Sequence, residues 1–177
     1  MISDYVKGKK QFDFPPLIQQ GIRLHRAIDE FTDNHMATRE IKAYFRPQYR
    51  LYAGAFTDVA YDFFLANDKQ EFALEQTLAD FSQEVYGQLE LYKEYFPERF
   101  ARMFPYMREY NWLCNYRLET GIEKSFEGLV RRSAYLTESA VAFRLFSENK
   151  EVMKTHYEVF FPELKQFAIH KLNELLK

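Results

Sequence analysis

The sequence predicts an all-α protein, and three observations support that prediction. The 177-residue chain contains only six glycines and six prolines, so few residues interrupt regular structure. The apolar–polar alternation that is typical of half-buried strands is scarce. Hydrophobic residues make up 47% of the chain, which at this length is enough to build one core without disulfides. We therefore expect one helical domain, a bundle that spans residues 1–177.

Prolines and capping residues predict where the helices begin and end. Pro15 and Pro16 suit a helix start, because proline in the first turn loses no needed donor, and Pro47 should stop that helix. Pro162 should bend or break the last helix. Capping boxes are expected at Asp68–Glu71 and Thr120–Glu123, and Thr137 can cap a further helix. The expected ranges are an irregular segment 1–14 and helices near 17–44, 51–66, 68–95, 98–110, 112–118, 120–133 and 147–177.

Composition argues against several classes of function. A formal net charge of −2 disfavours a protein that wraps nucleic acid or binds membranes through a polybasic surface. One cysteine, Cys114, allows no disulfide framework within the chain. No run of about 18 apolar residues is present, and the N-terminus lacks the pattern of a secretory signal. We expect no nucleic-acid partner, no membrane partner and a cytoplasmic location, whereas the oligomeric state stays open.

The first expected helix carries a polar series on its apolar face. His25, Asp29 and Asp33 follow at four-residue steps, so they fan over roughly 80° of the helix surface. One imidazole and two carboxylates on a common face can bind a divalent cation. The alternative is a core histidine bonded to a neighbouring carboxylate, with Asp33 in solvent.

The second expected helix is apolar nearly all round, which is typical of a buried helix. Asp58 and Asp62 are its only formal charges, and they lie four residues apart. Buried carboxylates are costly unless they are paired or bind a metal, and two on one face repel each other. The alternative is a pair of ordinary salt bridges to Arg26 or Arg50.

The two helices together favour a metal site. His25 and Asp29 with Asp58 and Asp62 form a mixed nitrogen and oxygen set, and Asp4 could reach it from the N-terminal segment. Such a set suits Mn²⁺, Mg²⁺ or Fe²⁺ better than a structural zinc. A cation held there could activate a water molecule and hold a phosphoryl oxygen.

Several motifs along the whole chain resemble the acyl carrier protein phosphodiesterase family, which is distantly similar to the all-helical HD phosphohydrolases. The most specific of them is the stretch from His25 to Asp33. The motifs are Asp4-Tyr5-Val6-Lys7-Gly8, Gly21-Ile22-x-Leu24-His25-Arg26-x-Ile28-Asp29-x-Phe31-Thr32-Asp33, Phe56-x-Asp58-x-x-Tyr61-Asp62-x-Phe64-Leu65-Ala66, Trp112-Leu113-x-x-Tyr116-Arg117, Gly128-Leu129-Val130-Arg131-Arg132 and His156-Tyr157 before Phe161-Pro162.

The resemblance implies a reaction and a set of residues. The reaction removes the 4′-phosphopantetheine arm from holo acyl carrier protein and leaves a free serine, with a divalent metal, typically manganese. By motif position the resemblance implies metal binding and water activation by Asp4, His25, Asp29, Asp58 and Asp62, with Asp33 as a weaker candidate. Asp29 or Asp62 would receive the proton of the attacking water.

The chain departs from the family pattern at two places. Family members usually carry an Asn-Phe-Leu-Ala-His segment upstream of the position of Asp4, and this chain starts too late to contain it. The second-helix motif usually reads Tyr-Asp-His-Phe, whereas here it is Tyr61-Asp62-Phe63-Phe64. Phenylalanine cannot ligate a metal. The absent segment and Phe63 therefore each remove one candidate imidazole, and we expect weaker metal binding and turnover.

Arginines supply candidates for substrate binding. Arg132 or Arg117 could hold a phosphodiester as a bidentate donor. Arg131 and Arg132, with three arginines between residues 98 and 110, could form a surface for an acidic carrier protein, and the alternative is a set of solvated helix faces. The substrate-binding candidates are Arg26, Arg117, Arg131 and Arg132.

Three hypotheses about function follow. The first is a metal-dependent phosphodiesterase that acts on holo acyl carrier protein. The second is a helical module that binds a carrier protein without turnover. The third is a phosphohydrolase for a nucleotide or another small phosphodiester, which rests on fold analogy alone.

Overall fold

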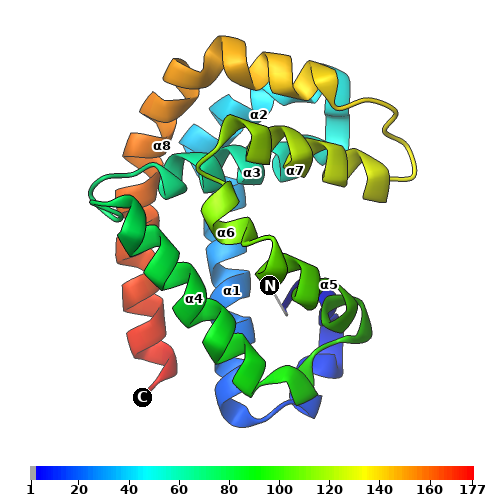
Figure 1. Ribbon diagram of the computed structural model, residues 1–177. Helices are drawn as coiled ribbons and strands as arrows, with labels where there is room; N and C mark the ends of the chain where they lie inside the picture. The colour runs from blue at the N-terminus through cyan, green and yellow to red at the C-terminus, as the bar shows by residue number, and fades with distance from the viewer. Residues whose placement is uncertain (1–2) are drawn as a thin grey trace.

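The computed structural model describes residues 3–177, and this part of the chain is all-α with no strand. The fold class predicted from the sequence is therefore confirmed. Figure 1 shows α2, α3 and α7 grouped beneath the long, curved α8, which also runs beside α1. The elements are η1 (Ser3–Tyr5), η2 (Gly8–Asp13), α1 (Pro16–Asn34), α2 (Met36–Tyr49), η3 (Arg50–Tyr52), α3 (Ala53–Ala66), α4 (Glu75–Leu91), η4 (Lys93–Tyr95), α5 (Glu98–Glu109), α6 (Trp112–Asn115), α7 (Glu119–Arg132) and α8 (Ala140–Leu175), where η denotes a 3-10 helix.

The main core lies between α2, α3, α7 and α8, where aromatic rings pack against one another. Phe45, Phe56, Phe126 and Phe146 are fully buried. The Phe56 ring lies 5.2 Å from Phe126 and 5.8 Å from Phe45, centroid to centroid. Burial of each such side chain contributes about 2–3 kcal/mol, so this cluster fixes α3 in place.

A second cluster joins α4, α5 and α6 (Figure 1). Its buried members are Tyr86, Phe100, Phe104 and Met107. The Tyr86 hydroxyl accepts a hydrogen bond of 3.0 Å from the backbone N–H of Leu113. This bond links α4 to α6, the short helix that leads into α7.

The first predicted helix, 17–44, is in fact two helices that meet at His35. His35 has an extended backbone, and its Nδ1 accepts from the Ala37 N–H at 3.2 Å, so the imidazole caps α2. The ring also packs edge-on against Phe160 of α8, 5.1 Å between centroids. The sequence pattern misses this corner because the partner that stabilises it comes from a distant helix.

The prediction that Pro47 ends a helix was wrong, and α8 does not break at Pro162. Helix α2 continues to Tyr49, because Phe45 and Tyr49 are both buried and hold the backbone on either side of the proline. Helix α8 runs unbroken from Ala140 to Leu175, with buried Phe160 just before Pro162. Here burial outweighs the roughly 3 kcal/mol cost of an internal proline.

The predicted capping box at Asp68 and Glu71 was also wrong, since α4 begins only at Glu75. Asp68 accepts from the Tyr157 hydroxyl at 2.9 Å and from the Gln70 N–H at 2.8 Å. Glu71 pairs with Lys165 at 2.6 Å. Both acids therefore tie the loop before α4 to α8 rather than starting a helix.

The prediction of a separate helix capped by Thr137 was wrong, because α8 begins at Ala140, before the expected start at 147, with Ser139 at its N-cap position. The other boundaries differ less. The segment predicted to be irregular contains η1 and η2, and its first two residues lie outside the described part. Helix α7 starts at Glu119, so Thr120 lies within its first turn and does not cap it. Helix α5 matches the prediction to within one residue, and α6 ends three residues early. No helix in residues 3–177 has the length and apolar character needed to cross a bilayer.

Candidate metal centre

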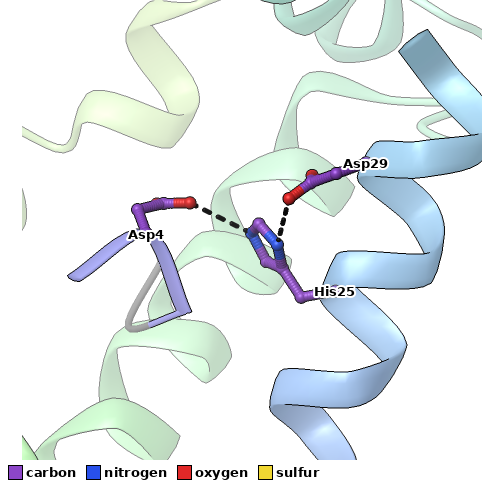
Figure 2. Close-up of side chains that lie close together, drawn as sticks. All are labelled: Asp4, His25 and Asp29. Carbon is purple, nitrogen blue, oxygen red and sulfur yellow. Dashed lines mark hydrogen bonds and ion pairs between the residues drawn. The ribbon is translucent and has the colours of Figure 1, made fainter. Parts of the chain in front are cut away.

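Three of the predicted ligands meet where η1 approaches α1. The His25 Nδ1–H donates to Asp29 Oδ2 at 2.9 Å, and His25 Nε2 lies 3.6 Å from Asp4 Oδ1 (Figure 2). One ligand atom from each of the three residues lies within 4.8 Å of the others. His25 is half-buried and both carboxylates are exposed, so a cation could enter from solvent.

Arg26, the neighbour of His25, positions the segment that carries Asp4. Its guanidinium donates to the Val6 carbonyl and to Gln11 Oε1, each at 2.8 Å. Val6 is itself buried. These bonds hold η1 against α1, and they direct the Arg26 guanidinium toward the N-terminal segment.

Asp33, the weaker candidate, lies one turn beyond Asp29 and forms an ion pair with Lys42 of α2 at 2.5 Å. It is exposed, as the alternative interpretation of the first helix expects. The positive charge of Lys42 also lowers the pKa of Asp58.

Asp58 of α3 faces the same acidic region from the other side. Its carboxylate keeps contact with solvent but is surrounded by protein atoms, and this desolvation raises its pKa to about 6. Lys42 lowers this pKa, whereas the charges of Asp33, Asp29 and Asp4 raise it further. Asp58 is therefore electrostatically coupled to the cluster, although it lies outside the group of three ligand atoms.

Asp62 lies one helical turn after Asp58 and is held by Tyr116. Burial is the main reason that the pKa of Asp62 rises to about 7, and the charge of Asp58 adds to it. The Tyr116 hydroxyl donates a hydrogen bond to the carboxylate, which favours the ionised form and partly offsets the rise. Burial likewise raises the pKa of the Tyr116 hydroxyl, which therefore stays protonated as a donor.

Ordinary salt bridges do not explain the two α3 carboxylates. Within residues 3–177, neither Asp58 nor Asp62 forms an ion pair with Arg26 or Arg50. The region thus holds five carboxylates, those of Asp4, Asp29, Asp33, Asp58 and Asp62, near one lysine and one histidine.

This donor set fits a divalent cation. One imidazole with several carboxylates is a ligand combination that Mn²⁺, Fe²⁺ and Mg²⁺ accept. A 2+ charge would stabilise the ionised forms of Asp58 and Asp62, whose pKa values are raised first by burial and then by neighbouring carboxylates. The His25–Asp29 bond has the arrangement in which a carboxylate orients a ligating imidazole through the other ring nitrogen.

Tyr116, the partner of Asp62, lines a cavity of about 490 Å³. Its wall is part aromatic and part cationic, with Tyr110 and Trp112 on one side and Arg131 and Arg132 of α7 on another. Arg132 also lies near enough to Tyr116 to lower the pKa of its hydroxyl. A site of this size and lining suits a partly apolar ligand that carries a phosphate.

Gly121 shapes this cavity, since it lets α7 start directly against α6. A Cβ at this position would lie 1.9 Å from the carbonyl oxygen of Asn115, so only glycine allows the two helices to approach this closely.

Arg117 and Phe63 lie differently from what motif position alone suggests. Arg117 forms a 2.7 Å ion pair with Glu75 of α4. The Phe63 ring packs edge-on against Phe146, 5.2 Å between centroids, beside the main core. Phe63 therefore contributes to packing in this chain.

Sequence reasoning did not assign two residues of the site. Tyr116 was present in the Trp112–Arg117 motif, but its bond to Asp62 depends on how α6 packs. Lys42 lies nine residues after Asp33, across the corner at His35 that was not predicted. On the continuous helix that was expected, the two side chains would be too far apart to pair.

Comparison with known proteins identifies the chain's relatives. The family profile described as acyl carrier protein phosphodiesterase matches residues 1–164. The curated acyl carrier protein phosphodiesterases of Yersinia pestis and Serratia proteamaculans are each 29% identical over 171 residues, 97% of this chain and 89% of theirs. That of Escherichia coli strain HS is 28% identical over the same share. No solved structure matches. The chain therefore belongs to the acyl carrier protein phosphodiesterase family, whose members are phosphoric diester hydrolases.

Proposed function

We propose that this protein hydrolyses the phosphodiester that links 4′-phosphopantetheine to a serine of holo acyl carrier protein, giving the apo carrier. Membership of the family supports this reaction. The observation that carries it is the row of carboxylates on η1, α1 and α3, whose member Asp62 is bonded by Tyr116, a residue that lines a cavity with two arginines. We also propose that residues 1–177 act as one domain in the cytoplasm, and the similarity to HD phosphohydrolases stays a prediction.

Asp4, His25, Asp29 and Asp58 are the proposed residues for a divalent cation, with Mn²⁺ preferred and Mg²⁺ or Fe²⁺ as alternatives. Bound there, the cation would lower the pKa of a water molecule and offset charge on a phosphoryl oxygen. Asp29 is also proposed to orient the imidazole of His25, because its bond to His25 Nδ1 leaves Nε2 directed toward Asp4.

Asp62 is the proposed proton acceptor, with Asp29 as the alternative. A general base works best when its pKa is near the working pH, and burial raises the pKa of Asp62 to about 7. Tyr116 holds the carboxylate through its hydroxyl and so fixes its direction. Water attacks phosphorus and Asp62 takes a proton from it. The bond between phosphorus and the serine oxygen breaks, and that oxygen takes up a proton from Asp62 or from solvent to become the free serine hydroxyl.

Arg131 and Arg132 are the proposed contacts for the phosphate and its arm, since they line the cavity beside Tyr116. The aromatic side of this cavity suits the partly apolar pantetheine chain. Arg117 and Arg26 are proposed as supporting residues, because their guanidinium groups already bond to Glu75 and to the Val6 carbonyl.

Mass spectrometry of holo acyl carrier protein tests the proposal. The carrier is incubated with the protein and Mn²⁺, and the expected result is loss of the phosphopantetheine mass from the carrier, which EDTA prevents. An unchanged carrier mass in saturating Mn²⁺, with a protein shown by circular dichroism to be folded, would refute the proposed reaction. A panel of nucleotides run in parallel tests the small-substrate alternative.

A further inference from the structure

A second hollow, of about 700 Å³, opens between α2 and the start of α3. Arg39, Lys42 and Arg46 line it from one face of α2, and Arg50 of η3 continues that row. Its floor is small and apolar, with Ala53, Gly54 and Ala55, and Asp58 lies at its inner end. The hollow is therefore basic at its rim and meets the candidate metal centre at Asp58.

Asp33 and Asp58 also line the hollow, but neither forms an ion pair with the rim arginines in residues 3–177. In residues 3–177 no carboxylate forms an ion pair with Arg39, Arg46 or Arg50, and all three are exposed. Lys42 differs, since it pairs with Asp33. Three guanidinium groups thus project from one surface of a protein whose net charge is −2, with no ion pair in the described part of the chain.

The basic face of α5 is different in this respect. Arg102 pairs with Glu98 one turn earlier, and Arg108 lies 3.6 Å from Glu90 of α4. Local carboxylates thus neutralise most of the charge that the sequence pattern suggested for this face.

The end of α2 adds an apolar feature to the same surface. Leu51 is 99% exposed, beside Arg50, whose backbone has a φ of 47°. A positive φ at a residue other than glycine is a strained backbone conformation. The chain thus holds Leu51 in solvent at the edge of the hollow, where a protein surface could bury it.

We propose that Arg39, Arg46, Arg50 and Leu51 form the docking surface for the acidic surface of the acyl carrier protein around its modified serine. This inference rests on the proposed function. The bond to be broken joins phosphorus to the serine oxygen, so the carrier body must reach the edge of the metal centre. The basic hollow meets that centre at Asp58, and its charge is complementary to an acidic partner.

Calorimetric titration with apo carrier at low salt tests docking without requiring turnover. The variant Arg39→Gln/Arg46→Gln/Arg50→Gln is compared with the matched variant Arg99→Gln/Arg102→Gln/Arg108→Gln, which changes net charge equally. We expect the α2 variant to bind at least tenfold more weakly and the α5 variant to bind as the parent does. Leu51→Ser should weaken binding several-fold with no change in thermal stability, since the side chain is already in solvent.

Equal losses in the two triple variants, an unchanged α2 variant, or no binding by the parent would overturn the docking surface. Hydrolysis of bis(4-nitrophenyl) phosphate provides a control for the metal centre. We expect the α2 variant to hydrolyse bis(4-nitrophenyl) phosphate at the parent rate and holo carrier more slowly. An equal loss of rate on these two substrates would overturn the inference. If the parent protein binds apo carrier but does not hydrolyse holo carrier, the proposed reaction is refuted. The binding comparison of the two triple variants then still tests the docking surface.

Discussion

Asp58 and Asp62 differ from the other acidic residues because protein atoms surround them and no arginine or lysine pairs with them in residues 3–177. Burial disfavours an ionised carboxylate, so each takes up a proton more readily than in the unfolded chain. Their raised pKa values are a cost at neutral pH that a bound cation would remove. Two measurable consequences follow for single residues.

Without metal, Asp62 should make the protein less stable as pH rises. Its folded-state pKa of about 7 lies above the usual aspartate value of 3.8, so the native state binds more protons than the unfolded chain between these pH values. Its contribution is fully present below about pH 4 and is lost as pH rises through 7. Asp62→Asn should therefore stabilise the metal-free protein at pH 8 by on the order of 2 kcal/mol, with little effect near pH 4.

Urea unfolding in EDTA at several pH values measures this difference. Asp13→Asn, at an exposed carboxylate of η2, serves as the control and should give curves that follow the parent. A stabilisation by Asp62→Asn that is the same at pH 4 and pH 8 would contradict the assigned cause.

Substitution of Asp62 and of Asp58 should affect different quantities, turnover in the first case and Mn²⁺ binding in the second. Asp62→Asn should lower kcat on holo carrier by about 10²–10⁴-fold, as expected for loss of a general base, with Mn²⁺ affinity reduced little. Asp58→Asn should instead weaken Mn²⁺ binding, because it removes a proposed ligand. Calorimetric Mn²⁺ titration together with carrier mass spectrometry distinguishes them, and loss of Mn²⁺ binding in Asp62→Asn would assign it as a ligand instead.

Helices place these residues by burying their opposite faces. On α3, Phe56, Ala60 and Phe64 are buried in the main core, so the face that carries Asp58 and Asp62 is turned away from it. On the other side of the cavity, α6 and α7 approach closely enough for Tyr116 to reach Asp62. The site thus depends on how closely these helices pack.

Gly121→Ala tests that packing. The new methyl group would collide with the Asn115 carbonyl, so the helices must separate at a cost of about 1–3 kcal/mol or more. We expect a lower melting temperature and, because Tyr116 moves, a lower kcat. Gly87→Ala in α4 is the control, since nothing lies within 4 Å of its Cβ position, and it should stabilise the protein by about 0.5–1 kcal/mol. Equal melting temperatures for the two variants would show that α6 and α7 tolerate separation.

Taken as a complete structure, the protein brings together segments that are far apart in the sequence. Figure 2 shows Asp4 of η1 beside His25 and Asp29 of α1. Asp58 comes from α3. A cation held by all of them would connect three elements that otherwise meet through separate contacts. Metal binding should therefore be measurable as stability of the complete fold.

Saturating Mn²⁺ should raise the melting temperature, and EDTA should reverse the change. A ligand that binds only the native state stabilises it by about 2.7 kcal/mol at a concentration of 100 times its Kd. His25→Ala should abolish the shift, whereas His170→Ala, at an exposed histidine of α8, should retain it. A shift that persists in His25→Ala would place the cation elsewhere.

The amino-acid pattern was sufficient for the fold class, for most helices and for the residues that form the polar face of α1 and α3. These features depend on neighbours within a few turns, which local periodicity and composition reveal. The meeting of Asp4, His25 and Asp29 was an expectation from the sequence, and its geometry comes from the bonds that Arg26 makes to Val6 and Gln11.

Tertiary packing decided the corner at His35, the continuation of helices through Pro47 and Pro162, and the use of Asp68 as a partner of Tyr157. It also decided the Tyr116–Asp62 bond and the basic hollow beside Asp58. Each of these depends on a side chain from a distant helix. Burial against such a partner contributes as much free energy as a local preference for capping or breaking a helix, so local rules could not predict the outcome.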